Sequence, residues 1–150
     1  MTSGGHARSG PVKQEGSARA EAAGFKLTEL PAEGFAGDVP EWPLAPAPSD
    51  VELEYWERAW RTPQACIWSK QEFSYLVPAV ARWVRLAVRC DDPEASAALL
   101  ARLPSVADEI GMSTAGLARL GAKIAPNVLG EKRAEMKVEM PKQERRLRSS

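Results

Sequence analysis

The chain is poor in the side chains that most catalytic and metal sites require. Among its 150 residues there is one histidine, His6, and it lies in a Gly- and Ser-rich stretch where nothing rigid would orient it for proton transfer. The sequence contains no GxxxxGK[ST] loop, no GxSxG motif and no cluster of His and Cys at metal-ligand spacing. We therefore expect a binding protein rather than an enzyme, with no catalytic residue, no metal and no cofactor.

Cysteine and long apolar runs are also scarce. The two cysteines, Cys66 and Cys90, form no metal or redox motif, and their place in apolar helical patterns predicts reduced, buried thiols. No stretch of eighteen uncharged apolar residues occurs, and the first residues lack the apolar core of a signal peptide. These absences predict a protein of the cytoplasm without a membrane partner.

Charge of neither sign is in excess, because 20 Lys and Arg balance 20 Asp and Glu. The distribution is uneven, however. Residues 131–150 carry seven basic residues and four Glu, whereas residues 1–48 carry four basic and six acidic residues. Any attraction to nucleic acid would therefore concentrate toward the carboxyl terminus, where the candidate contacts are Arg145, Arg146 and Arg148.

Composition divides the chain into a central domain and two tails. Residues 1–48 hold most of the Gly and few large apolar side chains, so this arm is expected to be mostly disordered, apart from a stiff strap at residues 40–44 that could dock on the core. Residues 126–150 are rich in Glu, Lys and Arg and lack an apolar stripe, which predicts a flexible basic tail. The ordered core is expected at residues 49–125.

Helical signals begin at Ser49, where Ser-Asp-Val-Glu forms a capping box. A second capping box at residues 69–72 would open the longest helix, which continues to about Cys90 and is expected to kink at Pro78. Large aromatic side chains are frequent in this region and would lie in the core, at a subunit interface or on a base-stacking surface. They are Trp56, Trp60, Trp68 and Trp83.

The longest predicted helix also carries a basic row opposite its apolar stripe. At 100° per residue, Arg82, Arg85 and Arg89 fall within about 60° of arc. Such a row is either a solvated face or a surface that contacts phosphate or an acidic partner, and both interpretations stay open.

Residues 103–123, LPSVADEIGMSTAGLARLGAK, have the order of a helix-turn-helix. The preceding helix would start at Asp92 and Pro93, bury its leucines and be interrupted by Pro104. Ala107 is small where two helices would cross, Gly111 suits a left-handed turn, and Ser113 suits a helix cap. The candidate DNA contacts are Ser113, Thr114, Arg119 and Lys123. With two cations and no Asn or Gln among the exposed positions, phosphate contacts would dominate; a helical hairpin that only packs is the alternative.

Three segments together resemble a known family. The runs GDVPEWPL, ELEYWERAWRTPQACIW and ADEIGMSTAGLARLGAKI resemble small terminase subunits of actinobacterial phages and prophages, over roughly residues 34–125. The block WERAWRTPQA at residues 56–65 is the most specific part. The resemblance implies a non-catalytic ring-forming protein that recognises viral double-stranded DNA and modulates a large ATPase–nuclease subunit. Many members place the helix-turn-helix before the oligomerisation helices, whereas here it follows the long helix.

The expected protein is therefore an all-α domain with a helix-turn-helix-like segment at residues 103–123 and flexible tails. Five Trp and a long apolar stripe in so small a core predict a homo-oligomer. Two other functions fit the same pattern. One is a helix-turn-helix transcriptional regulator, and the other is a helical phage structural or adaptor protein that does not bind DNA.

Overall fold

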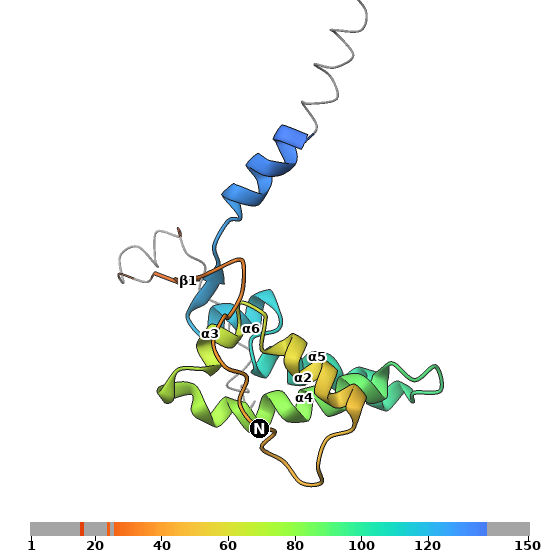
Figure 1. Ribbon diagram of the computed structural model, residues 1–150. Helices are drawn as coiled ribbons and strands as arrows, with labels where there is room; N and C mark the ends of the chain where they lie inside the picture. The colour runs from red at the N-terminus through yellow and green to blue at the C-terminus, as the bar shows by residue number, and fades with distance from the viewer. Residues whose placement is uncertain (1–15, 17–23, 25, 138–150) are drawn as a thin grey trace, which may run out of the picture.

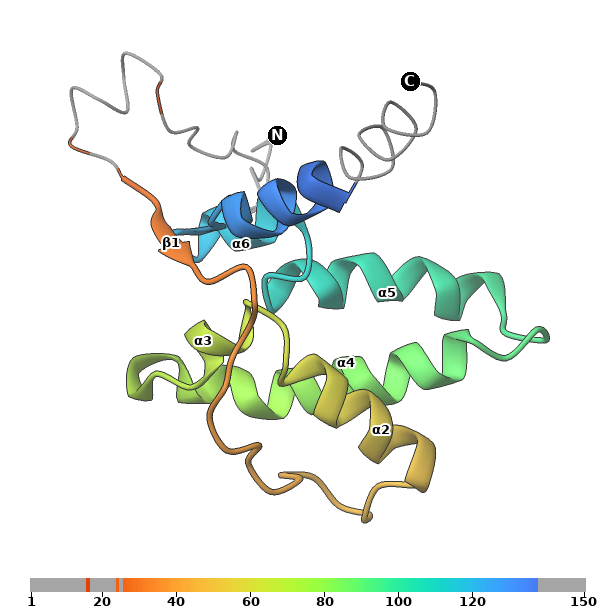
Figure 2. The ribbon, with the colours of Figure 1, turned by 45° about the horizontal axis from the view of Figure 1, so that its top comes forward.

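The computed structural model describes residues 16, 24 and 26–137, and most of the described chain is helical (Figures 1 and 2). Its helices and strands, in chain order, are β1 (Thr28–Leu30), α2 (Asp50–Ala59), α3 (Ala65–Trp68), the 3-10 helix η1 (Gln71–Leu76), α4 (Val77–Cys90), α5 (Ala97–Glu109), α6 (Thr114–Arg119) and β2 (Ala122–Ile124). A further helix covers residues 128–137. The prediction of a mainly helical domain is confirmed for this part of the chain.

A two-stranded parallel sheet is the exception to the all-α prediction. Thr28 of β1 lies opposite Ala122 of β2, and Leu30 lies opposite Ile124. The backbone amide of Ala125 donates to the carbonyl of Leu30 at 2.8 Å. The sheet therefore ties the amino-terminal arm to the segment that follows α6, across the whole helical region.

The arm that precedes α2 is part of the core from residue 26 onward. Leu27 and Leu30 are buried, and an apolar series further along the arm packs against the core (Phe35, Val39, Trp42 and Leu44). The Trp56 indole donates to the carbonyl of Pro40 at 2.9 Å. Figure 2 shows the arm passing α3 and α4 before it reaches α2. The predicted core start at Ser49 is therefore too late, because spaced single apolar residues in extended backbone give no periodic signal.

Tryptophans form the centre of the core. Trp56, Trp60 and Trp68 are each at most 2% exposed, and successive rings meet edge to face with centroids 5.6 Å apart. The Trp68 indole donates to the carbonyl of Ile110 at 2.8 Å, which joins α3 to the turn after α5. Trp83 is only partly buried at the edge of this core. Of the alternatives for these rings, the structure places the first three in the core.

The start of α4 differs from the prediction. The capping box predicted at residues 69–72 does not form, because no side chain there caps a helix. A 3-10 helix runs from Gln71 to Leu76 instead, and α4 begins at Val77. Pro78 lies in the first turn of α4, where the missing amide hydrogen has no helical partner to lose. Pro78 therefore fits the first turn of α4 and does not kink the helix. The capping box predicted at Ser49, in contrast, is confirmed, with Glu52 as its partner.

The start and the interior of α5 also differ. Ser96 rather than Asp92 caps the helix, because its hydroxyl accepts from the amide of Leu99 at 3.2 Å. Pro104 lies inside α5 and does not interrupt it. Leu100, which the periodicity turns inward, is 48% exposed. None of the residues of α5 itself is fully buried, so this helix lies on the core rather than in it.

Arg85 fixes the arm to the helices. Its Nε lies 3.3 Å from the Glu52 carboxylate, its Nη1 donates to the carbonyl of Ala45 at 3.2 Å, and its Nη2 donates to the carbonyl of Pro46. The guanidinium also lies 5.0 Å from the centre of the Trp42 ring. This residue therefore holds the strap and the two residues that follow it against α2 and α4, and it is not an exposed member of a basic row.

We expect Arg85→Ala to release the strap. The variant loses charge-assisted hydrogen bonds in a half-buried place, so it should lower the free energy of unfolding by about 2 kcal/mol. Limited proteolysis with mass spectrometry should then find new cleavage between residues 40 and 48. Arg82→Ala, at an exposed position of the same helix, is the control, and the protease should cleave it no faster than the native chain. Equal cleavage in both variants would contradict the role of Arg85.

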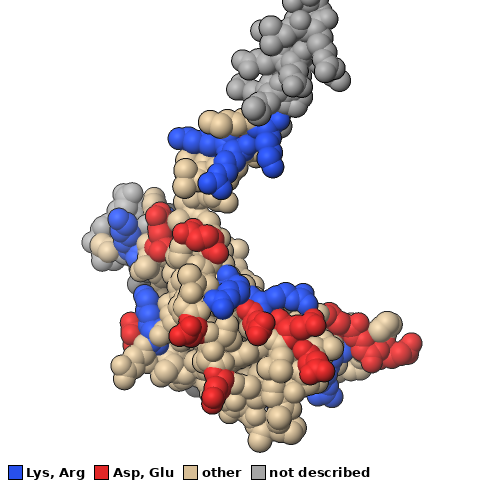
Figure 3. All heavy atoms as spheres, viewed as in Figure 1, with Lys and Arg blue, Asp and Glu red and all other residues tan. Residues whose placement is uncertain are grey.

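The described chain ends in a helix at residues 128–137 that stands clear of the other elements (Figure 1). Asn127 caps it, since its side-chain oxygen accepts from the amide of Gly130 at 3.0 Å. Figure 3 shows Lys and Arg side chains on this helix. The flexible tail predicted from residue 126 therefore begins with a helix. Arg145, Arg146 and Arg148 lie outside the described residues.

Candidate nucleic-acid interface

The segment between α5 and α6 contains a left-handed glycine and a capped helix start. Gly111 adopts a φ of +83°, which an L side chain rarely takes, and ends the first helix. The amide of Met112 donates back to the carbonyl of Ala107 at 2.9 Å. Ser113 then caps α6, its hydroxyl accepting from the amide of Gly116 at 3.0 Å. The predicted turn and cap are both confirmed.

Gly116 brings α6 close to α5. A Cβ atom built on this residue would lie 2.9 Å from the carbonyl carbon of Asp108 and closer still to the carbonyl oxygen. Leu117 and Ile110 are buried on either side of this contact. The sequence suggested Ala107 as the small residue at the crossing. The structure gives the close approach to Gly116.

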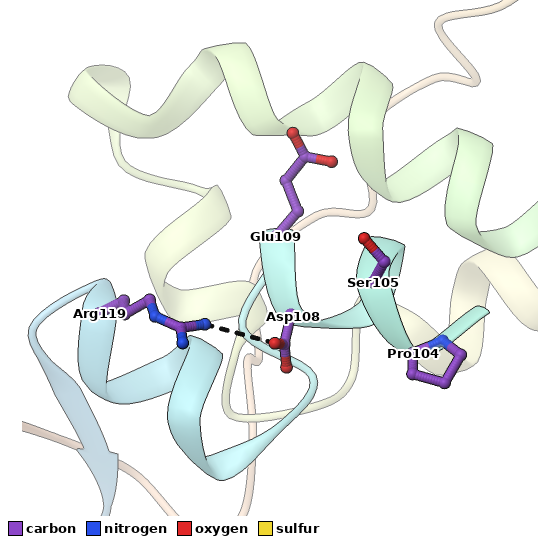
Figure 4. Close-up of a pocket in the computed structure, with 5 residues that line it drawn as sticks. All are labelled: Pro104, Ser105, Asp108, Glu109 and Arg119. Carbon is purple, nitrogen blue, oxygen red and sulfur yellow. Dashed lines mark hydrogen bonds and ion pairs between the residues drawn. The ribbon is translucent and has the colours of Figure 1, made fainter. Parts of the chain in front are cut away.

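The exposed cation of α6 faces a carboxylate. Arg119 lies 3.3 Å from Asp108, which also accepts a hydrogen bond from the Ser113 hydroxyl. Figure 4 shows this pair at a hollow of about 280 Å³ that Ser105 and Glu109 also line, with the Glu109 carboxylate pointing away from the pair. Because the guanidinium already faces the carboxylate of Asp108, the hollow does not favour an anion such as phosphate.

Lys123 is placed similarly, 3.8 Å from Glu29 across the sheet. Thr114, in the first turn of α6, is exposed and borders a second hollow of about 510 Å³. Exposed ion pairs of this kind contribute only about 0–1 kcal/mol, so a phosphate group could displace either carboxylate. The phosphate would then bind less favourably than at a cation without a carboxylate partner. The two cations near α6 are therefore weak contacts for any anionic ligand.

The basic row on α4 is divided by the fold. Arg82 and Arg89 are exposed, whereas Arg85 binds the strap. In Figure 2, α5 lies between α4 and α6, so the exposed pair and the α6 residues do not form one surface. Among the described residues, the predicted DNA contacts therefore fall into two separate groups.

Sequence reasoning counted the cations of residues 128–137 in the basic tail but did not place them on a helix. Lys132, Arg133 and Lys137 are all exposed on this helix, on the side that also carries exposed apolar residues. The available signal was Pro-Asn at residues 126 and 127, because Asn is a strong helix cap. The helix was not predicted because it has no apolar stripe. It needs none, since it packs on no other element of the described chain.

Among the residues that the structure describes, two groups have shifted pKa values. The Tyr55 hydroxyl on α2 donates to the carboxylate of Asp91 after α4, and this bond raises the pKa of Tyr55 above its usual value. Burial raises the pKa of the Cys66 thiol. Both shifts favour the uncharged form at neutral pH. The Tyr55 bond also joins the start of the helical region to the end of α4.

Within the described ranges, no group of three His, Cys, Asp or Glu could hold a metal ion, and no helix is both long and apolar enough to cross a membrane. No protein-family model, curated protein or solved structure matches the chain.

Proposed function

We propose that the chain is a small terminase subunit: a non-catalytic protein that binds phage double-stranded DNA and recruits the large ATPase–nuclease subunit in the cytoplasm of a bacterial host. The observation that carries the proposal is the α5–α6 pair, which has a left-handed glycine, a capped second helix and a close helix contact in helix-turn-helix order. The resemblance of residues 56–65 to the same family points the same way.

DNA binding in this proposal is mainly electrostatic. The two cations near α6 each face a carboxylate, and one Arg cannot read a base sequence alone. Arg145, Arg146 and Arg148 therefore supply more of the affinity than Arg119 does. Few phosphate contacts per subunit give weak binding by one copy, and a homo-oligomeric ring compensates by presenting many copies.

Exposed apolar side chains support assembly into an oligomer. Val51 and Leu53 on α2, Leu100 on α5 and Leu129 beyond β2 are each at least 41% exposed. Scattered single residues of this kind are ordinary, but several on short helices of one small domain favour subunit contacts. The same surfaces provide places where a large terminase subunit could bind.

The distribution of DNA affinity gives a direct test. We expect Arg145→Ala/Arg146→Ala/Arg148→Ala to flatten the dependence of log affinity on log salt by up to about 2.7 per subunit, because each lost phosphate contact removes about 0.9. Arg119→Ala should remove less than 0.9. Fluorescence anisotropy with phage and random duplexes over a salt series measures both slopes. If Arg119→Ala abolished discrimination between the duplexes and the triple variant changed nothing, α6 would be a base reader.

Asp108→Asn tests the same assignment with the opposite sign. The amide can still accept from the Ser113 hydroxyl, while the guanidinium of Arg119 loses its charged partner. DNA affinity should therefore rise, by about two- to fivefold for a weak surface pair. An unchanged affinity would mean that Arg119 does not face DNA.

One observation favours a second function, a helical phage adaptor without DNA binding. The carboxylate of Asp108 faces the only cation of α6, which is unfavourable for a DNA-reading helix. A salt-independent absence of binding to any duplex would support the adaptor. A dimer that binds a palindromic site would support the transcriptional regulator.

A further inference from the structure

The projecting helix has two unlike sides. At 100° per residue, Leu129, Lys132, Arg133, Met136 and Lys137 fall within about 140° of arc. Leu129 is 71% and Met136 is 67% exposed, and the two Glu residues of the helix fall on its other side. These five residues are called the basic–apolar face. Such a face suits a partner that is acidic and partly apolar.

The outer side of α2 has the complementary composition. Asp50, Leu53, Glu54 and Glu57 fall within about 100° of arc, opposite the buried Ala59, and all four are exposed. They are called the acidic face of α2. Glu54 pairs with Arg58 at 3.5 Å, but both side chains are 70% exposed, so this pair is weak. Figure 3 shows Asp and Glu side chains gathered over α2 and the turn that follows α4.

We propose that the basic–apolar face of one copy binds the acidic face of α2 on a second copy. Three cations meet three carboxylates, and Leu129 and Met136 cover the exposed Leu53. Burying these apolar side chains contributes about 25 cal/mol per Å², and the charges fix the orientation. The inference rests on the proposed oligomer and names the surfaces that build it.

The contact must join different copies. Figures 1 and 2 both place the projecting helix and α2 at opposite ends of the molecule, so one chain cannot close it on itself. Each copy then offers one face of each kind to two different neighbours. A head-to-tail contact of this type closes into a ring when the rotation between subunits permits it.

The apolar residues favour a protein partner over DNA. If Lys132, Arg133 and Lys137 bound a duplex, phosphate groups would cover Leu129 and Met136. Covering apolar side chains with phosphate contributes no binding free energy. A second copy covers them with Leu53. The DNA alternative remains an outcome of the test below.

Charge exchange between the two faces tests the proposal on the full chain. Lys132→Glu/Arg133→Glu makes both faces acidic, and Glu54→Lys/Glu57→Lys makes both basic. Light scattering without DNA should find each variant alone at the monomer mass of 16.3 kDa and the native chain as an oligomer. Mixing the two variants in equal amounts restores opposite charges at every contact, so the oligomer should return. Circular dichroism checks that each variant is folded.

The matched controls change charge by the same amount elsewhere. Arg82→Glu/Arg89→Glu and Glu72→Lys/Glu94→Lys alter exposed residues outside both faces and should keep the native mass. Charge-exchange variants that stay oligomeric alone, or stay monomeric when mixed, would overturn the proposed contact. If Lys132→Glu/Arg133→Glu lost DNA affinity at unchanged mass, the helix would bind DNA instead. Since mass is measured without DNA, a chain that assembles in this way but binds no duplex would disprove only the proposed function.

Discussion

Trp68→Ala should lower the free energy of unfolding by about 3–5 kcal/mol, which is a large part of the stability of a small domain. The side chain is 1% exposed and meets Trp60 edge to face at 5.6 Å. Its indole also holds the carbonyl of Ile110 in the turn that leads to α6. The variant therefore loses core volume and the link between α3 and the candidate interface. Urea denaturation followed by far-ultraviolet circular dichroism measures the loss.

A pair of milder variants separates the hydrogen bond from the packing. Trp68→Phe and Trp60→Phe both replace a buried indole by the smaller phenyl ring. Of the two indole nitrogens, only that of Trp68 has a hydrogen-bond partner within the described residues. Trp68→Phe leaves the carbonyl of Ile110 without its donor, so it should be about 1–3 kcal/mol more destabilising than Trp60→Phe. Equal losses would show that the bond to Ile110 contributes nothing.

Gly116→Ala should also be strongly destabilising, by about 3 kcal/mol or more. Alanine favours a helix over glycine by about 1 kcal/mol, so propensity alone predicts the opposite sign. The added Cβ would overlap the backbone of Asp108, which cannot turn aside as a flexible side chain does. The two helices must then separate, and DNA binding through α6 should fall with the melting temperature.

Gly121→Ala is the control for that substitution. It has open space for a Cβ but a φ of +79°, so it should be destabilising by about 1–2 kcal/mol through backbone strain alone. Thermal melts of the two variants compare a steric clash with backbone strain. A Gly116→Ala protein as stable as the native chain would mean that α5 and α6 do not pack in this way.

Local signals in the sequence were sufficient for several features of the fold. The capping box at Ser49 and Glu52, the left-handed Gly111 and the cap at Ser113 each depend on residues within four positions of one another. Such interactions are independent of the rest of the chain, and the spacing alone therefore predicts them. The sequence left open whether Trp56 and Trp60 lie in the core, at a subunit interface or on a base-stacking surface, and the structure buries both in the core.

Features that depend on distant residues could not be predicted. β1 and β2 are three residues each and about ninety positions apart, so neither shows the alternation of a longer strand. Arg85 belongs to a basic row in sequence, but the carbonyls that it binds lie about forty positions away. The pairing of Arg119 with Asp108 likewise depends on how α6 crosses α5. Tertiary contacts therefore decide which cations remain for a ligand.

The native mass of the full chain, measured with and without phage DNA, tests the proposed function most directly. The proposal predicts a homo-oligomer of many copies without DNA, and a heavier complex when phage duplex is added at low salt. A monomer of 16.3 kDa at tens of micromolar whose mass does not change with DNA would contradict both the ring and the DNA-binding role.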